Sequence, residues 1–397
     1  MKNAYLIAGI MLSLLLAACG DTDNSEPPAE LTTFDATLDL DLKWSSPAVE
    51  GVGQQYLFLT PMLSNDRIIT AGRDGEIKSM ALANGSVLSD LDLDTTLSAG
   101  IGGDGKLWLF ATRDAQVIAV DAVSKKVLWK ARVPSEVLAR PLLNQSAVIV
   151  RTVDGQILSL DAKDGTIRWS YKQVLPALTL RGNSEPILAR DRIFVGLDNG
   201  RLVALATSTG EVLWDVVLAV PEGRSEIQRL VDIDGQAELY GRILYAASYQ
   251  GRLVAIDVER GQFLWTRPFS SYSGITLDDK AIYSTDDHGH VWAIDRNNGA
   301  TLWKQDALTA RDVTRPVLMG DYLVVGDFDG YLHVMSRFDG HFVGRARIGE
   351  QDIENYSENN GILVPPEVVD HEILVTSRDG SVYAYTYKPL QPDLASR

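Results

Sequence analysis

The chain of 397 residues has little of several features, and each shortage excludes a class of protein. It contains one cysteine, Cys19, so no disulfide bond can form within the chain. Positive charge is scarce, because 37 Lys and Arg oppose 53 Asp and Glu to give a net charge of -16. That balance argues against nucleic-acid binding through a general cationic surface. Beyond the first 20 residues, no apolar run is long enough to span a bilayer.

The single cysteine follows a targeting segment. Lys2 gives a positive start, residues 6–16 form a short apolar run, and the ending Leu-Ala-Ala-Cys follows directly. This arrangement is typical of a signal peptide rather than a membrane-spanning helix. The ending resembles a bacterial lipobox, after which the cysteine is acylated. We therefore expect a signal peptide over 1–18, lipidation at Cys19 and a polar tether over 19–36, with plain secretion as the alternative.

One spacing recurs through the rest of the chain. A glycine turn is followed fourteen residues later by tryptophan in four places, and Ala115 and Trp129 keep the spacing with a small residue in the glycine position. The four pairs are Gly155–Trp169, Gly200–Trp214, Gly251–Trp265 and Gly289–Trp303. Turn anchors at 75, 115, 155, 200, 251, 289, 330 and 380 define eight units. Repeats of about forty residues with alternating strand patterns are typical of β-propellers.

Each unit supplies the parts of one propeller blade. Short apolar stretches are separated by Asp-Gly or Asn-Gly dipeptides, such as Asp154-Gly155 and Asn199-Gly200, which favour two-residue hairpins. A second glycine turn precedes the tryptophan-bearing stretch, so each unit predicts four antiparallel strands. The dense Val, Ile and Leu content fits sheets that are packed on both faces.

The last unit is incomplete, and this predicts how the ring closes. We expect its third strand to end near Tyr387, because Pro389 breaks the pattern. Residues 38–45 alternate and carry the missing indole at Trp44, so they can add the fourth strand. We therefore predict an all-β, eight-bladed β-propeller over 37–390 that is closed by an N-terminal strand. Residues 391–397 form a C-terminal tail.

The repeat resembles a known propeller repeat, first named in quinoprotein dehydrogenases. Its core runs from Ala255-Ile256-Asp257 through Gly261 to Trp265. The whole chain, with its lipobox, eight units and the segments 178–182 and 229–234, resembles the propeller lipoproteins of the outer-membrane β-barrel assembly (BAM) machinery. That resemblance implies a non-enzymatic scaffold with no cofactor and no metal.

The same resemblance implies a location and partners. The residue after Cys19 is Gly20 rather than aspartate, which in these lipoproteins favours the periplasmic face of the outer membrane. The expected partners are the periplasmic domains of a BamA-like barrel protein, the membrane through the lipid anchor and, as a weaker expectation, unfolded outer-membrane proteins. Nucleic acid is not an expected partner.

Unequal spacing between the units points to a binding surface. Extra residues fall between units at 171–185, 217–237 and 345–364, and the first two insertions flank the fourth blade. Long loops on a rigid scaffold commonly carry binding residues. The resemblance assigns the contact with BamA to Leu178, Leu180, Arg181, Asp232 and Asp234. An alternative stays open in which the leucines are buried under their own loops and Arg181 pairs with Asp232 or Asp234.

A quinone-dependent dehydrogenase or a ligand-binding propeller is the alternative function. A quinoprotein enzyme needs a calcium site, a catalytic aspartate and a quinone pocket, often beside paired cysteines, which this chain lacks. The pairs Asp232/Asp234 and Asp327/Asp329 faintly resemble calcium loops but lack the further oxygen ligands and the closing glutamate. His288 and His290 lie around a predicted hairpin turn with no evident further ligands. We predict no catalytic residues and no metal site.

Overall fold

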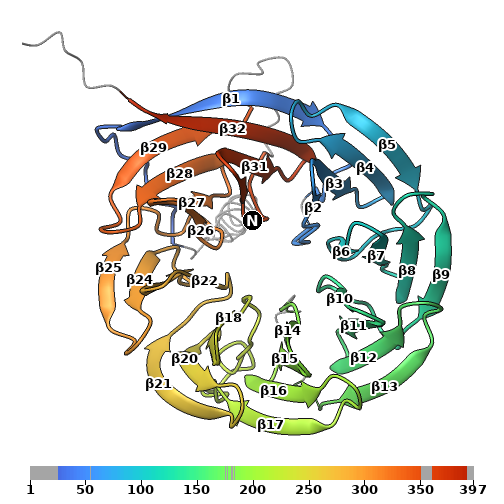
Figure 1. The fold of residues 1–397 in the computed structure, drawn as a ribbon. Helices are drawn as coiled ribbons and strands as arrows, with labels where there is room; N and C mark the ends of the chain where they lie inside the picture. Colours follow the sequence, from blue (N-terminus) through green and yellow to red (C-terminus); the bar gives the residue numbers. More distant parts are fainter. Residues whose placement is uncertain are drawn as a thin grey trace, which may run out of the picture.

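The computed structural model describes residues 26–53, 55–174, 176, 178–179, 182, 184–349 and 360–390. In this part of the chain, eight four-stranded antiparallel sheets stand side by side around a central axis (Figure 1). The predicted all-β, eight-bladed propeller is therefore confirmed. Among the described residues, no helix has the length and apolar character needed to cross a membrane. Cys19, Leu180 and Arg181 lie outside the described residues.

Seven blades are each built from four consecutive strands, with the innermost strand first. Blade 1 contains β2 (Met62–Ser64), β3 (Arg67–Ala71), β4 (Glu76–Ala81) and β5 (Val87–Asp92), and blade 2 contains β6 (Gly102–Gly103), β7 (Leu107–Ala111), β8 (Gln116–Asp121) and β9 (Val127–Arg132). Blade 3 contains β10 (Leu142–Asn144), β11 (Ala147–Arg151), β12 (Gln156–Asp161) and β13 (Ile167–Lys172). Blade 4 contains β14 (Ile187–Ala189), β15 (Arg192–Gly196), β16 (Arg201–Ala206) and β17 (Val212–Val217). Blade 5 contains β18 (Glu238–Tyr240), β19 (Ile243–Ala247), β20 (Gly251–Asp257) and β21 (Gln262–Phe269). Blade 6 contains β22 (Ile275–Leu277), β23 (Ala281–Thr285), β24 (Val291–Asp295) and β25 (Thr301–Gln305). Blade 7 contains β26 (Val317–Met319), β27 (Tyr322–Gly326), β28 (Tyr331–Ser336) and β29 (Phe342–Arg347). The middle strands are almost entirely buried, because each sheet packs between two others.

The eighth blade joins the two ends of the described chain. It consists of β30 (Glu367–Val369), β31 (Glu372–Thr376), β32 (Ser381–Pro389) and β1 (Leu38–Pro47), so the predicted closure is confirmed. β1 and β32 pair antiparallel along their whole length. The expected end near Tyr387 is corrected, because β32 continues to Pro389, opposite Leu38. A proline at the last strand position removes no interior ladder bond, so it does not stop the pairing earlier.

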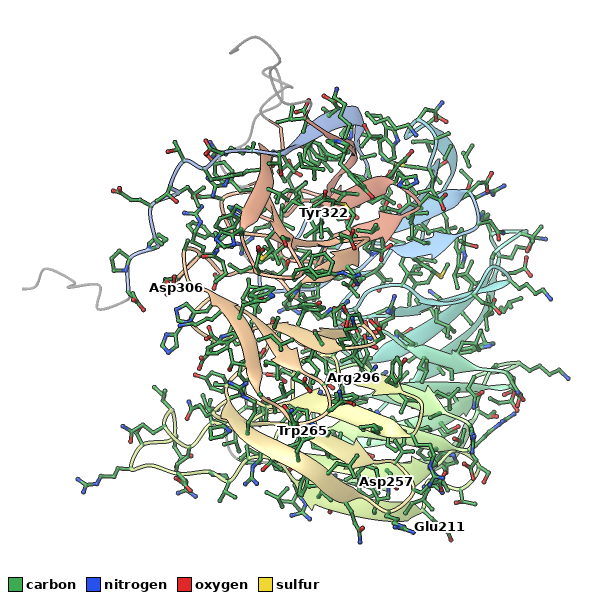
Figure 2. The ribbon with its side chains drawn as sticks, turned by 60° about the vertical axis from the view of Figure 1, so that its left-hand side comes forward. Glu211, Asp257, Trp265, Arg296, Asp306 and Tyr322 are labelled. Atoms are coloured by element: carbon green, nitrogen blue, oxygen red, sulfur yellow. The ribbon has the colours of Figure 1, made fainter. Side chains whose placement is uncertain are left out.

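The repeated tryptophans join each blade to the next. Each indole lies over the glycine of the neighbouring blade's second turn, where a Cβ atom would overlap the ring. Each indole N–H also donates to a carbonyl of that neighbouring turn, as Trp265 does to Arg296 at 2.9 Å (Figure 2). The six pairs are Trp44–Gly85, Trp129–Gly165, Trp169–Gly210, Trp214–Gly261, Trp265–Gly299 and Trp303–Gly340. Glycine readily adopts the positive φ of these turns, and the close approach of the ring leaves no room for a Cβ.

The two blades without this tryptophan precede neighbours that cannot receive one. Blade 1 has Ser89 in the tryptophan position, and the facing turn of blade 2 carries Lys125 instead of glycine. Blade 7 has Gly344, which lies against Leu38 of β1. Blade 8 has no second hairpin turn, because β1 supplies its outer strand from the other end of the chain. The missing indoles therefore follow from the geometry of the neighbouring blade.

The described part of the expected tether is attached to blade 7 and to the loop before it. The backbone of Ala29 donates to Thr309 O at 2.9 Å and accepts from the Arg311 guanidinium at 3.1 Å. Arg345 donates to Thr32 O at 2.9 Å, and its guanidinium lies over the ring of Phe34. From Ala29 onward this segment is thus a docked strap rather than a free linker.

We expect the indole contact to contribute measurably to stability. Gly210→Ala places a Cβ 2.5 Å from Cε3 of Trp169 and also forces alanine to a φ of 73°. The free energy of unfolding should fall by about 2–4 kcal/mol, the sum of left-handed backbone strain and overpacking. Urea denaturation followed by tryptophan fluorescence measures the change.

Gly320→Ala is the matched control, because Gly320 has a φ of 60° but no other atom within 4 Å of the position that an alanine Cβ would take. It should cost about 1 kcal/mol from backbone strain alone. Equal losses in the two variants would contradict an energetic role for the indole.

Candidate functional site

The two long insertions beside blade 4 are fixed to one hairpin turn. The first connects β13 to β14 and the second connects β17 to β18, so they flank blade 4 as predicted. Asn199 donates from its side chain to Val174 O at 3.4 Å, and the N–H of Leu218 donates to Gly200 O at 2.8 Å. Both insertions therefore emerge on the face that carries the Asp-Gly turns. The third insertion connects β29 to β30, two strands that belong to blades elsewhere on the ring (Figure 1).

The predicted partner-binding residues lie at different depths. Leu178 is 43% exposed, so the alternative in which it is buried under its loop does not hold for this residue. Asp232 and Asp234 are only 1% and 7% exposed. They lie beneath the loops and not on the outer surface. Because Arg181 lies outside the described residues, its expected pairing with either aspartate stays a prediction.

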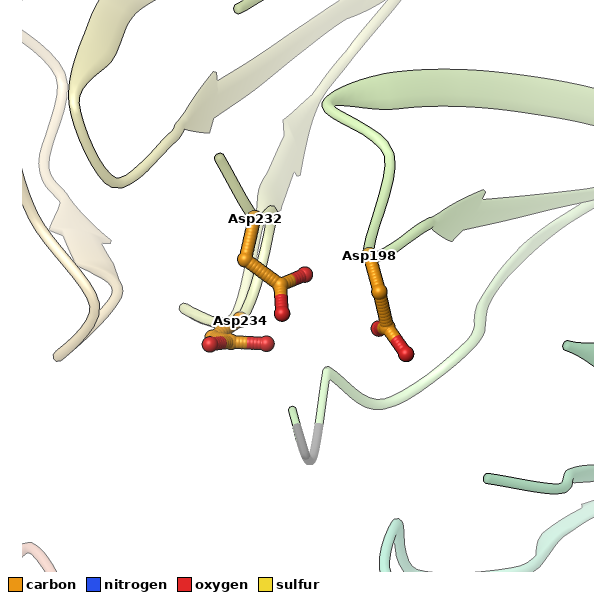
Figure 3. Close-up of side chains that lie close together, drawn as sticks. All are labelled: Asp198, Asp232 and Asp234. Carbon is orange, nitrogen blue, oxygen red and sulfur yellow. The ribbon is translucent and has the colours of Figure 1, made fainter. Parts of the chain in front are cut away.

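The two aspartates belong to a buried charged cluster that no sequence pattern indicated. Asp198, from the hairpin turn of blade 4, approaches them so closely that oxygens of the three carboxylates lie within 4.8 Å of one another (Figure 3). Arg151, at the end of β11, forms an ion pair with Asp198, and both side chains are only 4% exposed. The cluster thus joins blades 3 and 4 to the loop that leads into blade 5. Arg151 ends the apolar strand β11, and Asp198 follows the apolar strand β15. Only the three-dimensional arrangement brings these two side chains together.

Burial changes the acidity of the cluster. The pKa of Asp234 is raised well above its ordinary value, first by loss of solvation and then by the negative charge of Asp232. The positive charge of Arg151 opposes this effect. Asp234 therefore holds a proton to higher pH than an exposed aspartate does.

The cluster also supports the first insertion. Arg151 donates to Gly182 O at 3.3 Å. A Cβ on Gly182 would overlap Oδ1 of Asp234, so a side chain here would have to displace that carboxyl group. Gly182 ends the segment that carries the predicted contact residues Leu178, Leu180 and Arg181. The buried carboxylates are thus positioned to hold that segment in place.

Carboxylate oxygens at this spacing are also a potential metal-binding group, and among the described His, Cys, Asp and Glu side chains no other such group occurs. Arg151 already places positive charge on Asp198, so the cluster does not require a metal ion. The second faint calcium pattern is a structural turn. Oδ2 of Asp327 accepts from Arg311 at 2.8 Å and contacts His333 Nε2 at 2.9 Å, which uses the carboxylate for internal pairing.

The two histidines considered as ligands lie on a turn, as expected. His290 Nδ1 contacts Asp286 Oδ2 at 2.7 Å, and Trp292 Nε1 donates to the same oxygen at 2.8 Å. The side chain of His288 is 63% exposed. This part of the structure is consistent with a hydrogen-bonded turn at the surface.

The fold and the loop cluster define a class: a closed propeller of quinoprotein-type repeats with elaborated loops on one face. A family model described as "Outer membrane protein assembly factor BamB" matches residues 73–305 and 295–390. The outer membrane protein assembly factor BamB of Pseudomonas aeruginosa is 38% identical over 388 residues, covering 98% of this chain and 99% of the relative. The chain belongs to the BamB family.

Solved structures agree on the architecture. The crystal structure of BamB from Moraxella catarrhalis superposes with a TM-score of 0.78 at 28% identity, covering 88% of this chain and all of that one. The quinohemoprotein alcohol dehydrogenase of Comamonas testosteroni superposes with a TM-score of 0.69 at 13% identity, covering 89% of this chain and 78% of that one. The second likeness concerns the fold alone.

The raised pKa of Asp234 predicts a pH-dependent stability. An acid that keeps its proton in the folded state binds more protons than the unfolded chain above about pH 4, so its contribution to stability falls as the pH rises toward the folded-state pKa. Asp234→Asn should remove a slope of up to about 1.4 kcal/mol per pH unit in that window. Urea unfolding between pH 4.5 and 8 measures the slope. The exposed Glu211→Gln should leave it unchanged, and identical slopes in wild type and Asp234→Asn would refute the assignment.

Proposed function

We propose that this protein is a non-enzymatic scaffold lipoprotein of the outer-membrane β-barrel assembly machinery and that it binds the periplasmic domains of a BamA-like protein. The observation that carries the proposal is the pair of long insertions fixed to the turn at 198–200. Membership of the BamB family supports the assembly role, since the relatives are named as assembly factors.

The partner surface is formed by apolar side chains at the tips of the two insertions. On the first, Val174 and Leu178 are 87% and 43% exposed; on the second, Val220 and Ile227 are 52% and 70% exposed. Exposed apolar anchors beside an arginine are a common composition for the centre of an interface. We assign direct contact to Leu178, Leu180 and Arg181. We assign to Asp232 and Asp234 the task of holding the first insertion from below.

The strap supports a particular arrangement at the outer membrane. Ala29 is ten positions after Cys19, so an acylated Cys19 stays within roughly 35 Å of the strap's attachment on blade 7. Blade 4 lies on another side of the ring (Figure 1). In this proposal the lipid anchor and the partner surface occupy separate parts of the disc on the periplasmic face.

A second, weaker role is the binding of unfolded outer-membrane proteins by strand addition to an outer blade edge. β21 favours this role, because it is an eight-residue outer strand with Phe263 and Leu264 39% and 54% exposed. An exposed strand edge with apolar side chains can accept an extended segment.

Charge reversal tests the partner surface. Arg181→Glu should reduce recovery of the BamA-like protein in a pull-down from membrane extract by about tenfold or more, because it places a like charge or an unpaired one within the interface. The thermal melt should stay unchanged. Lys126→Glu, on the turn between β8 and β9 on the opposite face, is the control and should bind normally. Full recovery with Arg181→Glu would reject the surface.

Removal of the acylated thiol tests the anchor. Cys19→Ser should move the protein from the membrane pellet to the soluble periplasmic fraction, because no acyl chain is then attached. Fractionation followed by immunoblotting measures the shift. A variant that stays in the pellet would contradict lipid anchoring at Cys19.

A further inference from the structure

A cavity of 690 Å³ opens at the axis of the propeller, on the face that carries the long insertions. Its lining comes from connections between many different blades, including Tyr56 before blade 1, Leu97 before blade 2, Leu138 before blade 3 and Tyr272 before blade 6. Asp234 also lines it. A smaller cavity of 150 Å³ shares Tyr56, Asp234 and Tyr272, so the two form one axial space. Its size is typical of a small-ligand site.

Two pairs of aromatic rings line this space. Tyr56 and Phe58 meet edge to face with their centroids 5.0 Å apart, and the rings of Tyr249 and Tyr272 lie 6.4 Å apart. The faces of such rings attract cations. Elsewhere arginine occupies such a face, as Arg296 does 3.6 Å from the ring centre of Tyr240. Among the described residues, no lysine or arginine is positioned in this way over the four rings of the axial space.

Carboxyl groups outnumber basic side chains in the polar lining, and burial raises the pKa of two of them, Asp234 and Glu367. Three arginines and five carboxylates line the two cavities. Arg140 is already paired with Glu185 at 2.8 Å, and Arg315 lies 3.7 Å from Glu238. Asp234 is more than nine-tenths buried; its Oδ1 packs against Gly182, and its side chain interacts with Asp232. Ionising an acid this buried is costly unless a cation reaches it.

We propose that the axial cavity binds an organic cation, an alkylammonium or guanidinium group, with Asp234 as its counter-ion and Tyr56, Tyr249 and Tyr272 as aromatic walls. Asp234 holds a proton when no cation is present, so binding displaces that proton and the affinity for the cation should rise with pH. A basic side chain of a polypeptide and a free polyamine share this chemistry. The site is a property of the isolated propeller and does not require the proposed BamA-like partner.

Small probes test the site on the purified full chain at low ionic strength. Isothermal titration calorimetry should detect binding of Nα-acetyl-arginine N-methylamide, while the neutral citrulline analogue of the same shape should bind about tenfold or more weakly. Asp234→Asn should weaken the arginine probe by about tenfold or more, and Tyr272→Leu by several-fold. Spermidine is the second probe. If spermidine binds more tightly than the arginine probe and displaces it, the cavity favours a free polyamine. If spermidine binds more weakly than the arginine probe, the cavity favours a basic side chain of a polypeptide.

Matched controls separate the site from general charge effects. Glu211→Gln removes an exposed carboxylate on the opposite face and should leave affinity unchanged. Tyr272→Leu keeps the test informative if Asp234→Asn fails to fold. Equal affinity for the arginine and citrulline probes, or unaltered affinity in both folded variants, would overturn the proposal. Binding that appears only after Arg181→Gln would also overturn it, because the chain's own arginine would then be the occupant.

Discussion

The contact between an indole and a glycine of the next blade is the constraint on which the rest of the structure depends. A four-stranded sheet buries both faces only if it has a neighbour on each side, so the ring must close. Each Trp–Gly pair fixes the angle between adjacent blades through ring contact and one hydrogen bond. Pairing of β1 with β32 then covers edges that would otherwise remain open. The two positions without an indole are those where the following blade has no glycine turn to receive it.

A closed ring makes the loops on one face a rigid set. The insertions beside blade 4 are both hydrogen-bonded to one turn, through Val174 and Leu218. Beneath them, Arg151 and three aspartates form a buried charged cluster. Buried ion pairs contribute little net stability but specify geometry, because alternative packings leave charge unpaired. Here the cluster contacts Gly182 and so positions the end of the segment assigned to the partner.

Asp234 connects the two proposed binding functions. From the outside it lies under the first insertion, against Gly182, whereas from the axis it lines both cavities. A cation bound at the axis would stabilise the ionised form of this carboxylate and thereby alter the support beneath the insertion. The partner surface and the axial space therefore share one titratable group.

The sequence by itself determined the number of blades, their four strands and the closing strand at 38–45, because glycine turns and a strand period of two are local signals. It also located the insertions around blade 4 by their excess length. Only the tertiary structure decided which residues meet across blades. It brought Asp198 to Asp232 and Asp234, attached the strap from Ala29 through Arg311 and Arg345, and placed the aspartates below the surface. These contacts join positions far apart in the chain, so no local pattern records them; their distances depend on how eight sheets close into one ring.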